Sequence, residues 1–354
     1  MTGRVILTPL RVAAFAWWAS AGCGFHANAG SDDAFPDHDE ASKLVALPYP
    51  EGSPAPAAET TLEIVAYNTH LAGDSFVDSW ADAPRASWIS QTWMGELDWI
   101  AYQEVWDEGD LWNPYLRHHY EDRMCCSFTG FKYKGNLEHS GLAMHSRTSL
   151  LNAKQKEFHT GAGFEFFAAK GWLEATIVKD GIAFGLFNTH LQSDYYHDAI
   201  RARRSQMRQL SKRINKYKAA YPSRPVVAIG DFNVYGEDVK IDEYSTTFTE
   251  LMLRGAGLRD ITHESGIRDY TYTWDQDDNT LTRYFYPDND DGPSGRLDYI
   301  LFSNSRNGRM QIDPLDYAVL VPLSPQRMCD EGHCDYNLSD HYPVWARLRV
   351  YGAP

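Results

Sequence analysis

The stretch that decides the fold is Val227-Ala228-Ile229-Gly230-Asp231-Phe232-Asn233, in which an apolar, strand-forming run leads into a carboxylate and an amide. Two later stretches have the same design, Arg296-Leu297-Asp298-Tyr299-Ile300 and Leu338-Ser339-Asp340-His341-Tyr342-Pro343. Upstream, apolar runs also lead into Gln103-Glu104 and Thr189-His190-Leu191-Gln192. Strands that end in such groups present an acid, a base and metal ligands at one edge of a sheet. The order of these stretches therefore predicts the site of a metal-dependent phosphodiesterase.

Strands and helices alternate along the chain from Leu62 onward. The strand-like runs are Leu62–Tyr67, Trp99–Tyr102, Gly141–His145, Trp172–Val178, Phe184–Asn188, Val226–Ile229, Leu297–Phe302 and Val344–Val350. Between two of them, Asp198–Tyr217 has apolar residues at helical spacing. This alternation predicts an α/β sandwich with the sheets inside and the helices outside.

The polar face of the expected helix at Asp198–Tyr217 is strongly basic. It carries Arg201, Arg203, Arg204, Arg208, Lys212, Arg213, Lys216 and Lys218. A solvated helix face is the favoured interpretation, and attraction to anionic lipid headgroups is the alternative.

A short internal repeat links two of the strand-like runs. Tyr67-Asn68-Thr69-His70-Leu71 and Phe187-Asn188-Thr189-His190-Leu191 each stand at the end of an apolar run. Two strand–helix layers with similar architecture would produce this repeat. We therefore expect the two halves of the sandwich to be built alike.

The composition is that of a globular protein, and its charge bears on partners. Of the 354 residues, 43% are hydrophobic, which is ample for a full core. The formal net charge is −15. Proteins that bind nucleic acid backbones usually carry a net positive charge or a strongly basic face. The charge therefore argues against a nucleic acid partner.

The N-terminal residues divide into two predicted segments before the catalytic domain, which we place at residues 59–354. Residues 1–29 have the pattern of an export signal, with basic residues, an apolar stretch and the small residues Ala27-Asn28-Ala29. Cys23 offers the alternative of lipid attachment at the cell surface. Residues 30–58 are rich in Ser, Asp, Ala and Pro, which is typical of a linker. We expect a secreted or cell-surface protein.

Four cysteines remain if a signal containing Cys23 is removed, and an even number in an exported chain suggests disulfides. Cys329 and Cys334 close a short loop and are the favoured pair. Cys125 and Cys126 are adjacent. They would form a strained bridge with each other or stay as thiols, so their pairing stays open.

Hydrolysis of a phosphodiester needs a cation on the phosphoryl oxygens, a base for water and donors for the developing charge. Glu104, at the end of a strand-like run, is a candidate ligand for a hard cation, and Asn68 would complete that side of the site. Mg²⁺ typically uses one or two carboxylates together with water and substrate oxygens. We therefore expect Mg²⁺, with Mn²⁺ or Co²⁺ as substitutes.

His341 is the predicted general base, because a histidine titrates close to neutral pH. Asp298 is the expected partner that fixes its tautomer, and Asp340 would bind metal or hold the loop. Asp231 and Asn233 flank Phe232, so in extended backbone they face the same side. Both could then reach one phosphate. Asn233 would donate a hydrogen bond to it, and Asp231 would contact the metal or the leaving group. His190 is a further donor to phosphoryl oxygens.

These segments resemble the endonuclease/exonuclease/phosphatase superfamily, and within it the secreted bacterial neutral sphingomyelinases. The stretches most particular to the sphingomyelinases are Thr189-His190-Leu191-Gln192, Lys170-Gly171, Thr273-Trp274-Asp275, Tyr286-Pro287-Asp288 and Asp340-His341-Tyr342-Pro343-Val344. The resemblance runs from about Leu62 to Val350. It implies a four-layer α/β/β/α (DNase I-like) sandwich and a substrate-binding role for Lys170. It also implies Mg²⁺-dependent cleavage of sphingomyelin in membrane surfaces to ceramide and phosphocholine, by a monomer.

The sequence departs from that family at some positions. His70 and Asn188 stand where the family has other residues, so His70 is not expected to bind the metal. The family's membrane-entering hairpin has exposed aromatic residues. Val319-Leu320-Val321-Pro322-Leu323 occupies roughly that region without them, so it is either an apolar membrane contact or an ordinary core strand. Tyr284-Phe285-Tyr286 is a second candidate for lipid contact.

Three other functions compete with a sphingomyelin phosphodiesterase. One is a phospholipase C of broader headgroup range, since headgroup contacts cannot be read from the sequence. The second is a secreted nuclease of the same superfamily. The third is a catalytically inactive membrane-binding module, which the complete set of catalytic residues argues against.

Overall fold

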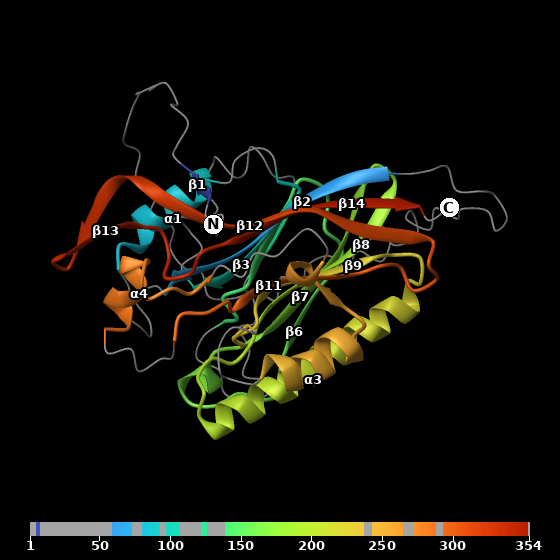
Figure 1. Cartoon of the computed structure of the whole chain (residues 1–354), viewed down its shortest axis with the longest axis horizontal. Coiled ribbons are helices and arrows are strands. Elements are labelled where there is room, and N and C mark those ends of the chain that lie inside the picture. Colours follow the sequence, from blue (N-terminus) through green and yellow to red (C-terminus); the bar gives the residue numbers. More distant parts are fainter. Residues whose placement is uncertain are drawn as a thin grey trace, which may run out of the picture.

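Two β-sheets lie against each other in the middle of the molecule, with helices outside them (Figure 1). The computed structural model describes residues 5–7, 59–72, 80–92, 97–106, 122–125, 139–236, 243–264, 272–287 and 293–352. Side chains from both sheets form the core between them, including Ile64 and Trp99 from the first sheet and Leu173, Ile229 and Ile300 from the second. Burial of this apolar surface is the main force that holds the sheets together.

The first sheet has the strand order β1-β12-β14-β2-β3-β5-β4, and β13 pairs with β12 outside this path. Its strands are β1 (Val5–Leu7), β2 (Glu59–Leu71), β3 (Trp99–Val105), β4 (Asp122–Cys125), β5 (Ala143–Ser146), β12 (Met310–Asp330), β13 (His333–Asn337) and β14 (Val344–Gly352). Within it, β2 and β3 are parallel, so their C-terminal ends meet at one edge. That edge carries Asn68 and Glu104.

The second sheet has the order β10-β11-β9-β8-β7-β6. Its strands are β6 (Leu151–Glu157), β7 (Gly171–Lys179), β8 (Ile182–His190), β9 (Val226–Asp231), β10 (Arg259–Asp260) and β11 (Asp298–Ser303). Parallel pairing of β8 with β9 places His190 opposite Asp231. Antiparallel pairing of β9 with β11 places Asp231 opposite Asp298.

Helices cover the outer faces of both sheets. The helical elements are α1 (Asp82–Thr92), η3 (Phe164–Phe167), α3 (His197–Ala220), η4 (Tyr244–Gly255), η5 (Ile261–His263) and α4 (Thr280–Phe285). Buried residues of α1 and α4 pack on the first sheet, and those of α3 and η4 pack on the second. The predicted four-layer α/β/β/α sandwich is confirmed.

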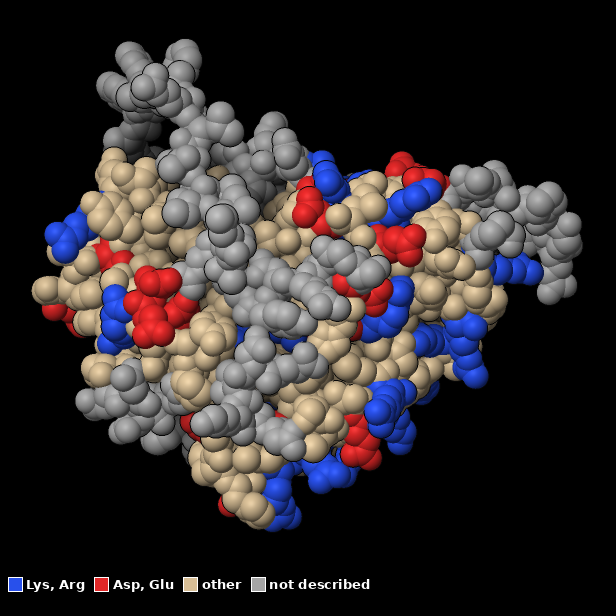
Figure 2. Space-filling model, in the orientation of Figure 1, with Lys and Arg blue, Asp and Glu red and all other residues tan. Residues whose placement is uncertain are grey.

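The helix predicted at Asp198–Tyr217 is α3, and its apolar stripe is buried as expected. One residue assigned to its polar face is not exposed. Arg203 is fully buried, pairs with Glu243 at 2.6 Å and donates to Gln192 O at 2.6 Å. Arg213 also pairs, with Glu174. Figure 2 shows Lys and Arg side chains along the side of the molecule where α3 lies, and contact with anionic lipid stays a prediction.

Strand β12 settles the alternatives for Val319–Leu323. Val319, Leu320 and Val321 are at most 9% exposed and belong to core clusters. This segment is therefore a core strand, and a membrane patch there is wrong. At the end of the β12–β13 hairpin, Cys329 and Cys334 form the predicted disulfide.

The other candidate for lipid contact, Tyr284–Tyr286, is only partly accessible. Phe285 is buried, Tyr284 stacks on His333 with ring centroids 4.0 Å apart, and Tyr286 lies against Trp274. Lipid contact there stays a prediction.

Several predictions concern segments that the structure describes only in small part. Within residues 1–58 it describes Val5–Leu7, which pairs in parallel with Leu320–Pro322. The rest of the export signal, Cys23 and the linker lie outside the described residues, as does Cys126. Among the described residues, no helix is long and apolar enough to cross a membrane.

Candidate active site

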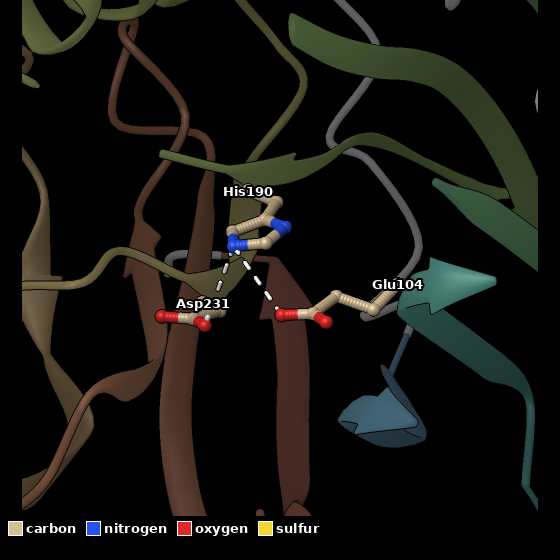
Figure 3. Close-up of side chains that lie close together, drawn as sticks. All are labelled: Glu104, His190 and Asp231. Carbon is tan, nitrogen blue, oxygen red and sulfur yellow. Dashed lines mark ion pairs between the residues drawn. The ribbon is translucent and has the colours of Figure 1, made fainter. Parts of the chain in front are cut away.

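Strand ends from both sheets bring the predicted site residues together. Figure 3 shows Glu104, His190 and Asp231 pointing toward one another from β3, β8 and β9. Gly230 makes the approach of β8 and β9 possible, because its φ is 141° and a Cβ there would lie 2.0 Å from Thr189 O. Only glycine fits at this position.

Asn68 joins the two sheets at the centre of the site. Its Nδ2 donates to Glu104 Oε1 at 2.7 Å and to Asp231 Oδ2 at 3.0 Å. His190 Nε2 lies 3.8 Å from that Glu104 oxygen and 3.6 Å from that Asp231 oxygen. Ligand atoms of Glu104, His190 and Asp231 all lie within 4.8 Å of one another. These carboxylate, amide and imidazole groups suit a divalent cation.

His341 lies on the other side of Asp231 and is held by Asp298. The His341 Nδ1 to Asp298 Oδ2 distance is 2.8 Å, and His341 Nε2 lies 3.9 Å from Asp231 Oδ2. Burial lowers the pKa of His341, but Asp298 and then Asp340 outweigh it and raise this pKa well above its ordinary value. Burial, together with Asp298, raises the pKa of Asp231 to about 7. Glu104 and His341 therefore line the same site, through Asp231.

Thr273 fixes the backbone around this imidazole–carboxylate pair. Its Oγ1 accepts from Leu297 N at 2.9 Å and from Asp298 N at 3.2 Å, and its carbonyl accepts from Tyr342 N at 2.6 Å. One residue thus holds both Asp298 and the neighbour of His341. This is the structural contribution of the Thr273-Trp274-Asp275 stretch.

The expected extended backbone from Asp231 to Asn233 is wrong. Asn233 has φ 50°, and its N–H donates to Asp231 Oδ1 at 2.8 Å, which closes a local turn. Its Nδ2 donates to Leu191 O at 3.0 Å. Asn233 still lies beside Asp231, because the turn replaces strand alternation in bringing them together.

Lys170 lies beside His190. Lys170 Nζ is 3.0 Å from His190 Nε2, donates to Leu191 O at 2.8 Å and pairs with Glu165. Burial, and next the positive charge of Lys170, lower the pKa of His190 well below its ordinary value. His190 is therefore a neutral imidazole beside a buried ammonium group.

Asp340 and His70 occupy the opposite side of Glu104. His70 Nδ1 lies 3.5 Å from Glu104 Oε2 and 3.4 Å from Asp340 Oδ2. Ser339 Oγ, which donates to Asn68 O at 2.7 Å, lies 3.1 Å from Asp340 Oδ1. Burial opposes charging of Glu104, but the imidazoles of His70 and His190 outweigh it and lower its pKa. All the predicted site residues thus lie in one connected cluster.

The sequence interpretation missed two residues of this region. His70 was not expected there, although the repeat it shares with His190 is a signal that both histidines end equivalent strands. Arg85 of α1 is fully buried and donates to four backbone carbonyls, Thr69 O at 2.9 Å, His70 O at 2.5 Å, Leu338 O at 3.1 Å and Trp80 O at 2.8 Å. It ties the end of β2 to the loop of Asp340, and nothing in the sequence pattern marks it.

Asn188, the counterpart of Asn68 in the repeat, binds buried backbone and Gln103. Its Nδ2 donates to Tyr102 O and Ala143 O, both at 2.9 Å, and its Oδ1 accepts from Gln103 Nε2 at 2.7 Å. It is a buried polar link between the two sheets beneath the site.

Comparison with known proteins identifies the family of this chain. The profile of the Endonuclease/Exonuclease/phosphatase family matches residues 81–341, and the chain belongs to that family. It is 28% identical to sphingomyelinase C of Listeria ivanovii over 304 residues, covering 80% of this chain and 84% of that protein. It is 25% identical to a phospholipase C of Staphylococcus aureus over 307 residues, covering 81% and 87%.

A solved structure supports the fold. A mutant beta toxin from Staphylococcus aureus with bound magnesium ions has a TM-score of 0.64 to this chain at 23% identity, covering 81% of this chain and 99% of the toxin. The resemblance to bacterial sphingomyelinases that the sequence indicated is thereby confirmed.

Proposed function

We propose that this chain is a Mg²⁺-dependent phosphodiesterase that hydrolyses sphingomyelin to ceramide and phosphocholine. The observation that carries the proposal is His341, whose Nδ1 binds Asp298 while its Nε2 points toward the carboxylate of Asp231. An imidazole held in this way can act as a general base. It would take a proton from a water molecule that attacks a phosphodiester bound beside Glu104, Asn68 and Asp231.

In the proposed reaction His341 Nε2 takes a proton from the attacking water, and Asp298 stabilises the imidazolium that results. The water oxygen bonds to phosphorus as the bond from phosphorus to the ceramide oxygen breaks. The leaving oxygen takes up a proton from solvent water, and Asp231, which lies between Glu104 and His341, would contact the metal or the leaving group. A positioned general base typically accounts for about 10²–10⁴ of the rate.

The residues that would hold the metal are Glu104, Asn68, Asp231 and Asp340. The donor set fits Mg²⁺, since most of its ligand atoms are carboxylate or amide oxygens. The Asn68 amide would have to present its oxygen to the ion, whereas its nitrogen now contacts both carboxylates. When bound, the cation would neutralise the phosphoryl oxygens and orient the diester for attack.

Three groups would bind the phosphoryl oxygens on the other side. Lys170 and His190 are buried together, and the Asn233 amide lies beside Asp231. A desolvated ammonium group stabilises developing phosphoryl charge far more than an exposed one. These positions support Lys170, His190 and Asn233 as substrate-binding residues.

The substrate is inferred from relatives with sphingomyelinase C in their names and from the net charge of −15. The charge disfavours nucleic acid as a substrate. The broader alternative is a phospholipase C that accepts several headgroups, which the name of the Staphylococcus aureus relative favours. We further propose a monomer that is exported and acts at membrane surfaces.

The decisive experiment is phosphocholine release from sphingomyelin vesicles by the purified chain with Mg²⁺. We expect release that EDTA abolishes and Mg²⁺ restores. Phosphatidylcholine vesicles in parallel carry the same phosphocholine headgroup on a glycerol backbone, so they measure the range of lipid backbones. Phosphatidylethanolamine vesicles measure the range of headgroups, and plasmid nicking measures nuclease activity. Plasmid cleavage without phosphocholine release would replace the proposal with the nuclease alternative.

A further inference from the structure

The outer face of α3 carries positive charge that neither the core nor the proposed reaction uses. Eight of the 33 Lys and Arg residues of the chain lie in this 24-residue helix, which has one acidic residue, Asp198. Two of the eight hold the fold together, since Arg203 pairs with Glu243 and Arg213 pairs with Glu174. The whole chain has a net charge of −15. The helix therefore concentrates charge of the sign opposite to that of the protein.

Four of these basic side chains form one straight row along the helix. Arg204, Arg208, Lys212 and Lys216 stand four residues apart, and all are exposed. Residues at this spacing are neighbours on a helix surface, and at 1.5 Å per residue the row is about 18 Å long. Like charges at this spacing destabilise a helix, whereas a helix face that is only solvated commonly alternates acidic and basic residues. The row therefore favours an anionic partner.

Neighbouring acids do little to neutralise this row. Glu250 lies 3.8 Å from Arg204, with side chains that are 66% and 45% exposed. An ion pair as exposed as this one contributes little, because water and salt screen it. In the described part of the chain, Arg208, Lys212 and Lys216 have no ion-pair partner. Their charge is therefore available to a partner, and Figure 2 shows Lys and Arg side chains along the side where α3 lies.

The row begins beside the loop that leads away from the candidate active site. Arg203, directly before Arg204, donates to Gln192 O at 2.6 Å, and Gln192 is two residues from His190. Tyr196, directly before α3, is 45% exposed and is one of three exposed large hydrophobic residues in the described part of the chain. Tyrosine suits a membrane–water interface because its ring is apolar and its hydroxyl is polar. A membrane bound along this face would therefore lie close to the active site.

We propose that the row Arg204, Arg208, Lys212 and Lys216 docks the protein on membranes that contain anionic lipid, with Tyr196 at the level of the headgroups. Each basic side chain near an anionic membrane adds to the attraction, and several together give stable binding. A lipid surface fits this face better than nucleic acid, because the proposed substrate of the neighbouring site is itself a membrane lipid. The docking stands by itself, whereas its effect on hydrolysis rests on the proposed function.

The test measures binding of the full chain to vesicles by flotation, with EDTA present so that no lipid is hydrolysed. Vesicles of phosphatidylcholine alone are compared with vesicles that also contain about 30% phosphatidylglycerol, and we expect about tenfold or tighter binding to the second. Salt at about 0.5 M should abolish the difference, because it screens exposed charges. The double variant Arg208→Glu/Lys212→Glu should lose about tenfold or more in binding to the anionic vesicles.

Arg347→Glu/Arg349→Glu is the matched control, because it changes the net charge by the same amount on the other sheet. Both residues lie on β14 of the first sheet, whereas α3 packs on the second, and their side chains are 42% and 43% exposed, similar to that of Arg204. Their partners are exposed acids, so the loss of these pairs should leave the fold intact. We expect less than about a twofold change in binding to anionic vesicles.

Equal binding of the parent to both kinds of vesicle would overturn the proposal, and so would equal losses in the α3 variant and the β14 control, which would make net charge the cause. Tighter capture by plasmid DNA or heparin than by anionic vesicles would also overturn it and assign the row to another polyanion. Docking that depends on the row, without hydrolysis of sphingomyelin in the same vesicles with Mg²⁺, would support the docking and count against the proposed function. The two failures are therefore distinguishable.

Discussion

Tyr67-Asn68-Thr69-His70-Leu71 ends β2 in one sheet, and Phe187-Asn188-Thr189-His190-Leu191 ends β8 in the other. The threonines behave alike, since each hydroxyl donates to a carbonyl of the neighbouring strand, Gln103 O and Gly171 O. The histidines also behave alike, because they approach the two oxygens of Glu104 from opposite sides. The asparagines do not. Asn68 contacts Glu104 and Asp231, whereas Asn188 is bound to backbone and to Gln103.

Strand register explains the difference. Asn68 pairs with Gln103, directly before Glu104, and the bulge that follows draws His70 toward the same carboxylate. In β8 the ladder stays regular, so Asn188 pairs with Ile229 and only His190 reaches the level of Asp231. The same five-residue pattern thus supplies two site residues in one strand and one in the other. A motif specifies side chains, and register decides which of them reach the site.

The largest effect should come from a residue outside both repeats. His341→Ala should lower kcat by about 10²–10⁴ because neither repeat supplies another base beside Asp298. Steady-state hydrolysis of sphingomyelin vesicles measures it, with circular dichroism to establish the fold. Activity close to that of the parent would show that His190, or His70, acts as the base instead.

Glu104 is contacted by the histidines of both repeats. Glu104→Gln should raise the metal concentration needed for half-maximal activity by tenfold or more. The substitution keeps the shape but removes the charge that a divalent cation needs. Activity is measured across a Mg²⁺ titration. An unchanged titration curve would show that Glu104 is not a metal ligand. The position of both histidines beside Glu104 would then have no bearing on metal binding.

Lys170 distinguishes the two histidines, because among the described residues it lies beside His190 and no lysine contact is found for His70. Lys170→Met should lower kcat/KM about tenfold through loss of a buried cation for the phosphoryl oxygens. It should also raise the pKa of His190, since Lys170 adds to burial in lowering that pKa. NMR titration of the His190 ring measures this shift. A pKa that stays in place would mean that burial alone sets the protonation of His190.

The asparagines give the sharpest contrast in stability. Asn188→Ala should cost about 2–4 kcal/mol of unfolding free energy, because it removes three buried hydrogen bonds, those to Tyr102 O and Ala143 O and the one from Gln103 Nε2. Activity per folded molecule should be largely kept. Asn68→Ala should do the reverse, with a small loss of stability and a clear loss of activity. Denaturant unfolding beside hydrolysis assays separates the two outcomes, and equal stability losses would contradict the comparison.

The sequence predicted most of the fold because its strands carry strong local patterns. Runs such as Val226–Ile229 and Leu297–Phe302 are mainly apolar; the first lies within β9, and all of the second but Leu297 lies within β11. The β12–β13 hairpin was missed as a strand pair, since Pro314, Pro322 and Pro325 interrupt a 21-residue strand that the rest of the sheet stabilises. Arg203 was misplaced because its burial depends on Glu243, which is distant in sequence.

What the sequence alone determined was the inventory of the site: which carboxylates, amides and imidazoles stand at strand ends, and in what order. These features are local, since strand patterns and polar termini are set by neighbouring residues. The tertiary structure decided the rest. Register, the bulge at His70 and the turn at Asn233 depend on pairing between segments far apart in the chain. Side-chain roles at the site follow from distances of a few ångströms, and only long-range pairing sets those distances.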